Sequence, residues 1–119
     1  MPDILRRTVG VSQSPVVDLW VEAPDVEPYM GIPESNRLGY DRGSNLSLVQ
    51  NLKGNLLIIH GTSDAGAPLS GTMRLIATLT AAAKPYDLAL LVHGGHNDVP
   101  LNSYVQERTI QYLVEHLRP

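Results

Sequence analysis

The stretch NLLIIHGTSDAGAP, residues 55–68, decides how this chain is expected to fold. Its first five residues, 55–59, form a short apolar run bounded by the Lys53–Gly54 turn and by His60–Gly61. Because the run is apolar on both faces, it predicts a buried strand of a parallel sheet. The loop that follows carries Asp64, a side chain that can take part in catalysis.

A second strand is predicted over YDLALLVHG, residues 86–94. It is followed by His96, another side chain that can take part in catalysis. The segment between the two strands has the apolar period of a helix. Its apolar stripe consists of Thr72, Leu75, Ile76, Leu79 and Ala83. We expect Lys84–Pro85 to end this helix, because the residue before a proline is disfavoured in the helical region.

Two further elements complete the expected pattern. RTVGVSQSP, residues 7–15, predicts a short strand, and LNSYVQERTIQYLVEHL, residues 101–117, predicts a long helix with Ser103 as its N-cap. One side of that helix carries the apolar residues Ile110, Leu113, Val114 and Leu117. Prolines limit residues 16–31 to short helical turns, and residues 32–51 are the longest loop-like section. Strands alternating with helices indicate an α/β fold with parallel strands and right-handed crossovers.

Length and composition exclude several classes of protein. The 119 residues are enough for one domain, 1–119, and a net charge of −3 is too acidic for a nucleic-acid footprint. The chain has no cysteine, which excludes disulfides and thiolate metal sites. No apolar stretch reaches the roughly 20 residues that span a bilayer, so no membrane partner is expected. The start MPDILRR lacks the apolar core of a signal peptide, and we expect a cytoplasmic protein.

Asp64 and His96 stand 32 residues apart, one helix and one strand. The carboxyl ends of parallel strands meet at the same edge of a sheet, so this carboxylate and this imidazole can meet there. A carboxylate that accepts the Nδ1 proton of a histidine is the acid–histidine part of a serine-hydrolase triad. Each residue also has a simpler interpretation, since Asp64 suits a loop cap and His96 an exposed loop position.

Histidines and aspartates also suggest a metal site. The residues that could be drawn as ligands are His60, His93, His96, Asp64 and Asp98. No HxH or HExxH spacing supports such a site, and His60 and His93 at strand ends are better explained by rings bonded to the backbone. We therefore expect neither a metal nor any other cofactor.

A nucleophile is harder to find. Ser12 and Ser14 lie in GVSQS, which has the form of a G-x-S-x-G elbow without its last glycine. An elbow needs a strand, a sharp turn and then a helix, whereas Pro15 follows here and no clear helix opens behind the serine. Ser63 and Ser70 also lack that context. Ser12 and Ser14 therefore remain weak candidates.

Several linked motifs resemble the closing part of the catalytic domain in the prolyl oligopeptidase family, which includes dipeptidyl-peptidases and acylaminoacyl-peptidases. They are NLKGNLLIIHGTSD, MRLIATLTAAAKPYDLALLVHGGH and YVQERTIQYLVEHLRP, preceded by GVSQSPVVDLW and PYMGIPESNRLGYDRGSNLS. The resemblance covers residues 8–119 and implies part of an α/β-hydrolase sheet, about three parallel strands with crossover helices and a C-terminal helix. It assigns Asp64 and His96 to the triad and implies that the nucleophilic serine precedes this segment.

The chain departs from the family pattern beside both triad positions. Ala65 and Gly66 stand where relatives usually have Asp and Asn, and Asn97 stands where they usually have Gly. The resemblance implies a small ester or peptide substrate, with weak ester or lactone hydrolysis as the limit for the chain alone. The first strand would have an unpaired outer edge, which predicts a homo-oligomer. The alternative is a non-catalytic, truncated module that folds only as that oligomer.

Overall fold

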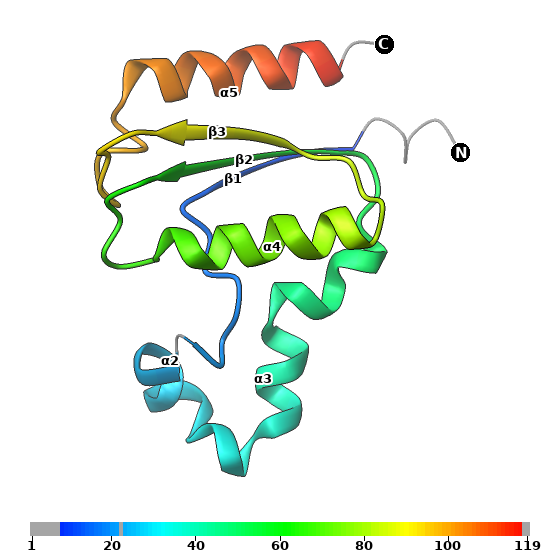
Figure 1. Ribbon diagram of the computed structural model, residues 1–119, viewed down its shortest axis with the longest axis vertical. Helices are drawn as coiled ribbons and strands as arrows, with labels where there is room; N and C mark the ends of the chain where they lie inside the picture. The colour runs from blue at the N-terminus through cyan, green and yellow to red at the C-terminus, as the bar shows by residue number, and fades with distance from the viewer. Residues whose placement is uncertain (1–7, 22, 118–119) are drawn as a thin grey trace.

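A three-stranded parallel sheet forms the centre of the computed structural model, which describes residues 8–21 and 23–117. The strand order is β1 (Val9–Gln13), β2 (Asn55–Gly61), β3 (Asp87–Leu91). Helix α4 (Leu69–Ala81) covers one face of the sheet and α5 (Ser103–His116) the other (Figure 1). This confirms the expected α/β fold. The start MPDILRR, including Arg7 of the predicted first strand, lies outside the described residues.

The central strand β2 is buried on both faces, as its apolar composition requires. Leu57, Ile58 and Ile59 are all fully buried. Leu57 and Ile59 pack on the α5 side with Val105 and Tyr112, whereas Ile58 packs on the α4 side. Burying one such side chain contributes about 1.5–3 kcal/mol relative to leaving it exposed. The two small cores therefore hold both helices to the strand that precedes Asp64.

Helix α4 follows its predicted stripe except at its end. Thr72, Leu75 and Leu79 are buried against the sheet. The helix stops at Ala81, and Ala83, predicted as the last residue of the stripe, is exposed with a φ of 53°. The Lys84 N–H bonds to the Leu79 carbonyl, which closes a left-handed helix cap. The predicted end at Lys84–Pro85 was therefore three residues late.

Helix α5 has a different orientation and a different cap from those expected. Its N-cap is Asn102, whose side chain accepts a hydrogen bond from the Val105 N–H, and not Ser103. The residues that α5 buries are Val105 and Tyr112. The predicted apolar side is largely exposed, with Ile110, Val114 and Leu117 each more than half accessible. The large Tyr112 ring packs on the sheet and sets the rotation of the helix about its axis.

The loop predicted for residues 32–51 is wrong. This region contains the short helices η1 (Pro33–Ser35), α3 (Arg37–Gly43) and η2 (Asn45–Asn51), preceded by α2 (Ala23–Met30). Asn36 caps α3 by accepting from the Gly39 N–H, and Tyr40 is fully buried with its hydroxyl donating to the Gly31 carbonyl. The Asn36 cap and the buried Tyr40 ring stabilise these helices, although the polar composition of the segment had predicted a loop. No helix in the described part of the chain is long and apolar enough to cross a membrane.

Candidate active site

Two loops meet at the carboxyl edge of the sheet. The loop after β2 donates its Thr62 N–H to the Leu91 carbonyl at 3.0 Å and its Ser63 N–H to the Gly94 carbonyl at 2.9 Å. These backbone bonds tie it to the loop after β3, so both loops are held in one arrangement. The edge at which parallel strands end thus carries Asp64 and His96 side by side.

Asp64 and His96 form a hydrogen-bonded pair. His96 Nδ1 lies 2.8 Å from Asp64 Oδ2, and since a carboxylate only accepts, Nδ1–H is the donor. The Asp64 side chain is fully buried, whereas that of His96 is 51% exposed. A buried acid thus orients a half-exposed imidazole, whose Nε2 is left available for proton transfer.

Hydrogen bonds determine the ionisation of Asp64. Burial acts to raise its pKa, but the hydrogen bond from the Ala67 N–H to Oδ1, at 2.7 Å, and the bond from His96 act in the opposite direction. Their combined effect holds the pKa of Asp64 below its ordinary value of 3.8. The carboxylate is therefore ionised at neutral pH, as a partner for an imidazolium must be.

We expect acid to destabilise this chain partly through Asp64. Because the pKa of Asp64 is lower in the folded than in the unfolded chain, its contribution to stability is present above pH 3.8 and is lost as the pH falls further. Urea unfolding at pH 6 and pH 3 should therefore show a smaller acid loss in Asp64→Asn than in the parent chain. Asp25→Asn, in α2, is the control with the same charge change. An equal acid loss in parent and Asp64→Asn would contradict the assignment.

Gly61, the last residue of β2, lets the two loops approach each other. A Cβ at this position would overlap the Gly94 carbonyl, a backbone group that cannot rotate away. We expect Gly61→Ala to destabilise the fold by about 1–3 kcal/mol and to separate His96 from Asp64. Gly71→Ala in α4 is the control, because its Cβ meets Val17 at an ordinary 3.8 Å. Urea unfolding measures the loss, and equal stability of the two variants would contradict the prediction.

Neither His60 nor His93 takes part in the Asp64–His96 hydrogen bond. His60 is fully buried, and its Nε2 lies 2.7 Å from the Ala67 carbonyl oxygen. His93 is exposed with a φ of 64°, and its N–H bonds to Thr62 Oγ1. Asp98 accepts from the Gly95 N–H and shapes the histidine loop. Within residues 8–21 and 23–117, no three His, Cys, Asp or Glu side chains are grouped to hold a metal ion.

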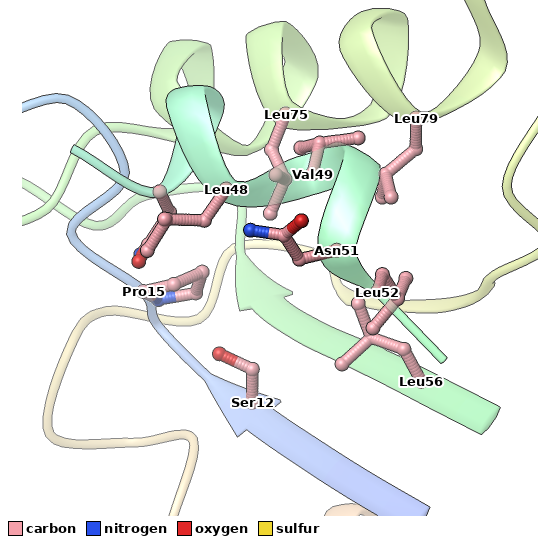
Figure 2. A pocket seen from close by; sticks show the side chains of 10 residues that line it. Ser12, Pro15, Leu48, Val49, Asn51, Leu52, Leu56, Leu75 and Leu79 are labelled. Atoms are coloured by element: carbon pink, nitrogen blue, oxygen red, sulfur yellow. The ribbon is translucent and has the colours of Figure 1, made fainter. Parts of the chain in front are cut away.

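Ser12 and Ser14 lie on or beside β1. Ser12 lines an apolar groove of about 300 Å³ on the α4 face, together with Leu52 and Leu56 (Figure 2). Ser14 follows β1 with a φ of 48°, and its buried Oγ has no hydrogen-bond partner among the described residues. Neither serine forms a hydrogen bond with His96 in the described part of the chain. The structure therefore pairs neither with a base.

Some residues at this site were not predicted from the sequence. Ala67 contributes both of its backbone groups, its N–H to Asp64 and its carbonyl to His60. Thr72 was predicted only as part of the α4 stripe, but its hydroxyl lies 2.8 Å from His60 Nδ1. The Ala67–Pro68 step is the one signal in the sequence, since it marks where the loop must turn into a helix. The partners of the two Ala67 groups depend on tertiary contacts.

Comparison with known proteins identifies the family of this chain. The family model of the prolyl oligopeptidase family matches residues 8–119. The chain belongs to this family. Dipeptidyl peptidase 8 from Mus musculus and from Homo sapiens is 32% identical to it over 120 residues, covering 88% of this chain. These relatives are named as peptidases, and about a third of their aligned residues are identical to those of this chain.

Solved structures of related peptidases superpose on nearly all of the described fold. A Bacteroides ovatus protein assigned as a dipeptidyl aminopeptidase IV matches with a TM-score of 0.85 and 31% identity over 98% of this chain. Dipeptidyl peptidase 4 of Porphyromonas gingivalis matches with a TM-score of 0.84 and 28% identity over 92% of it. The chain spans 16% of each of these proteins and 13% of dipeptidyl peptidase 8. It corresponds to a segment of their catalytic domains.

Proposed function

We propose that this chain supplies the acid–base half of a serine-peptidase active site, with Asp64 and His96 as two members of a catalytic triad. The observation that carries the proposal is the 2.8 Å bond between His96 Nδ1 and Asp64 Oδ2 at the carboxyl edge of the sheet. The nucleophilic serine would come from residues that precede this segment in a longer polypeptide, or from a second polypeptide. Membership of a family with dipeptidyl peptidases favours short peptides as substrates.

The proposed mechanism assigns one role to each residue. His96 Nε2 takes the proton of the serine hydroxyl as the serine attacks the scissile carbonyl, and later gives it to the leaving amine. The buried Asp64 carboxylate holds Nδ1–H and stabilises the imidazolium that forms between these two steps. Water then attacks the acyl-enzyme while His96 takes its proton. His96 returns that proton to the serine as the second product leaves.

The described residues by themselves support only weaker chemistry. His96 could act as a general base on water against an activated ester or lactone, an effect worth roughly 10²–10⁴-fold. Without oxyanion donors the reaction would lack a further 10²–10³-fold for each donor, so peptide bonds would be out of reach. A short-chain activated ester is therefore the substrate on which to assay the isolated chain.

We also propose that the half carrying the nucleophile joins at the outer edge of β1. Thr8 accepts from the Asn55 N–H and Ser14 donates to the Ile59 carbonyl, so the even-numbered residues of β1 face β2. In a parallel ladder successive residues address opposite neighbours, so the backbone groups of Val9, Val11 and Gln13 point away from β2. They present the hydrogen-bonding edge for one more parallel strand.

The groove beside Ser12 fits the helix that would connect such a strand to β1. Right-handed crossovers that progress in one direction across a sheet place their helices on the same face. The β2–α4–β3 crossover therefore predicts that a preceding crossover helix would lie on the α4 face, next to β1. The groove opens at that position, and the side chains that line it are largely apolar, with Leu48, Val49 and Leu52 among them (Figure 2).

A segment exchange tests the proposed function. This chain would replace the matching segment of Porphyromonas gingivalis dipeptidyl peptidase 4, with which it shares a TM-score of 0.84. We expect the chimera to hydrolyse a chromogenic dipeptide amide, and the isolated chain to hydrolyse at most an activated ester. A chimera that folds cooperatively, but neither reacts with an active-site serine probe nor cleaves the amide, would overturn the proposal.

A second function is favoured by the same edge of β1. The described residues leave this edge unpaired and the groove beside it open. Unpaired backbone groups at a sheet edge can pair with the same edge of a second copy of the chain. We propose as the alternative a non-catalytic module that forms a homo-oligomer by pairing β1 edges. The chimera distinguishes the two functions, since a module without catalytic use would leave it inactive.

Gln13 offers a sharp test of this oligomer. Its side chain is exposed, and its backbone N–H is one of those that point away from β2. Gln13→Pro removes that donor and leaves the ladder to β2 intact, so we expect the dissociation constant of the oligomer to rise about tenfold. Gln13→Ala, which keeps the N–H, should have no effect. Sedimentation equilibrium measures both, and a monomeric parent or an unchanged Gln13→Pro variant would contradict edge pairing.

A further inference from the structure

A chain of hydrogen bonds connects helix α4 to the Asp64–His96 pair. Thr72, in the first turn of α4, places its Oγ1 2.8 Å from His60 Nδ1, and His60 Nε2 lies 2.7 Å from the Ala67 carbonyl oxygen. The Ala67 N–H in turn donates to Asp64 Oδ1 at 2.7 Å. Thr72, His60 and Ala67 are all at least 98% buried, so none of these bonds competes with bulk water.

The bond partners determine where the proton of His60 lies. A backbone carbonyl can only accept, so Nε2 must carry a proton and donate it to Ala67. The Thr72 hydroxyl can then donate to the unprotonated Nδ1, which satisfies both ring nitrogens without burying a charge. The geometry therefore selects the neutral Nε2–H tautomer of His60.

This tautomer also keeps His60 from competing for the carboxylate. His60 Nε2 is 3.7 Å from Asp64 Oδ2, which is too long for a hydrogen bond, whereas His96 Nδ1 is 2.8 Å from the same oxygen. The proton of His60 is directed at the Ala67 carbonyl, a buried acceptor for which residues 8–21 and 23–117 offer no other donor. Asp64 Oδ2 is thereby left for His96.

We infer that His60 is a positioning residue for Asp64. By holding the Ala67 carbonyl, it fixes the backbone whose N–H orients the carboxylate, and Thr72 fixes the tautomer that makes this possible. The relevance of this role to catalysis rests on the proposed function. The role itself concerns the hydrogen bonds of Asp64, and it can be measured without turnover.

Two substitutions of His60 distinguish the roles of its two ring nitrogens. Gln places an amide nitrogen near the Nε2 position and can still donate to Ala67, whereas Asn reaches only the Nδ1 position. In hydrogen-exchange NMR of the full chain, we expect the Ala67 amide to exchange about tenfold faster in His60→Asn and near the parent rate in His60→Gln. Amides of α5 should keep their parent rates in both variants. Nitrogen-15 shifts of the His60 ring in the parent should show the Nε2–H tautomer.

Thr72 supplies a milder pair of variants if His60→Asn fails to fold. Thr72→Val keeps the shape and removes the hydroxyl, and Thr72→Ser retains it. We expect loss of the single His60 tautomer and weaker protection of the His96 Nδ1 proton in Thr72→Val alone. Equal Ala67 exchange in His60→Asn and His60→Gln, or an Nδ1–H tautomer in the parent, would overturn it. An inactive chimera with these signals intact would count against the proposed function and leave the positioning role in place.

Discussion

In the segment-exchange chimera, His96→Ala should lower kcat/KM for a dipeptide amide by a factor on the order of 10⁶. The imidazole is the group proposed to take and return the serine proton, and removing the histidine of a working triad costs about as much as removing the whole triad. His96 is half exposed and contributes little to either core, so the loss should not come from unfolding. Steady-state kinetics with a matched thermal melt separates the two causes.

His93→Asn is the control for this prediction. His93 is another exposed histidine in the same loop, and asparagine tolerates its left-handed backbone, φ 64°, while keeping the N–H that bonds Thr62. We expect its activity to stay within a few-fold of the parent chimera. If His96→Ala kept more than a hundredth of the parent activity, the chemistry would not depend on this imidazole.

Asp64→Asn should reduce kcat/KM of the chimera on the order of 10⁴-fold, which is the usual cost of losing the orienting acid. An asparagine can keep the Ala67 bond through its carbonyl oxygen, so its amide group would then face His96 Nδ1. His96 Nδ1 would then have to accept a hydrogen bond from this amide, so the ring proton would move to Nε2. The imidazole would then hold the wrong tautomer for taking a proton from serine.

Asp98→Asn is the matched control for this substitution. Asp98 lies two residues after His96 and accepts a hydrogen bond from the Gly95 N–H, a contact that an asparagine oxygen can keep. It changes the charge near the site by the same amount and leaves the imidazole partner intact. A loss of equal size in Asp98→Asn and Asp64→Asn would mean that charge near the loop, and not orientation of His96, sets the rate.

The sheet and the meeting of Asp64 with His96 could be predicted because both follow from local patterns. Two short apolar runs separated by one helical segment predict two parallel strands joined by a crossover helix. Parallel strands end at the same edge of the sheet. The rotation of α5 could not be predicted in this way. Its apolar residues suggested a face with Ile110 and Val114, but the single ring of Tyr112 fills the space over the sheet, and those residues remain exposed.

The helices of residues 32–51 were hidden by their composition. Gly, Ser, Asn and Arg are typical of loops, yet Asn36 is a helix cap and Tyr40 is a fully buried anchor in this region. The C-terminal limit of α4 was missed for a related reason, since the left-handed turn at Ala83 is made by an ordinary alanine without a glycine signal. Caps of this kind depend on bonds that form only once the neighbouring backbone is in place.

By itself, the sequence determined the parallel strands and the two residues that follow them, because these depend on short-range periodicity and on which strand ends where. The family followed from the resemblance of its motifs. The tertiary structure decided how Asp64 is held. Its carboxylate depends on Ala67, and Ala67 depends on His60 and Thr72 across the gap between loop and helix. Hydrogen-bond direction and burial are properties of atoms brought together from separate elements, and periodicity along the chain carries no record of them.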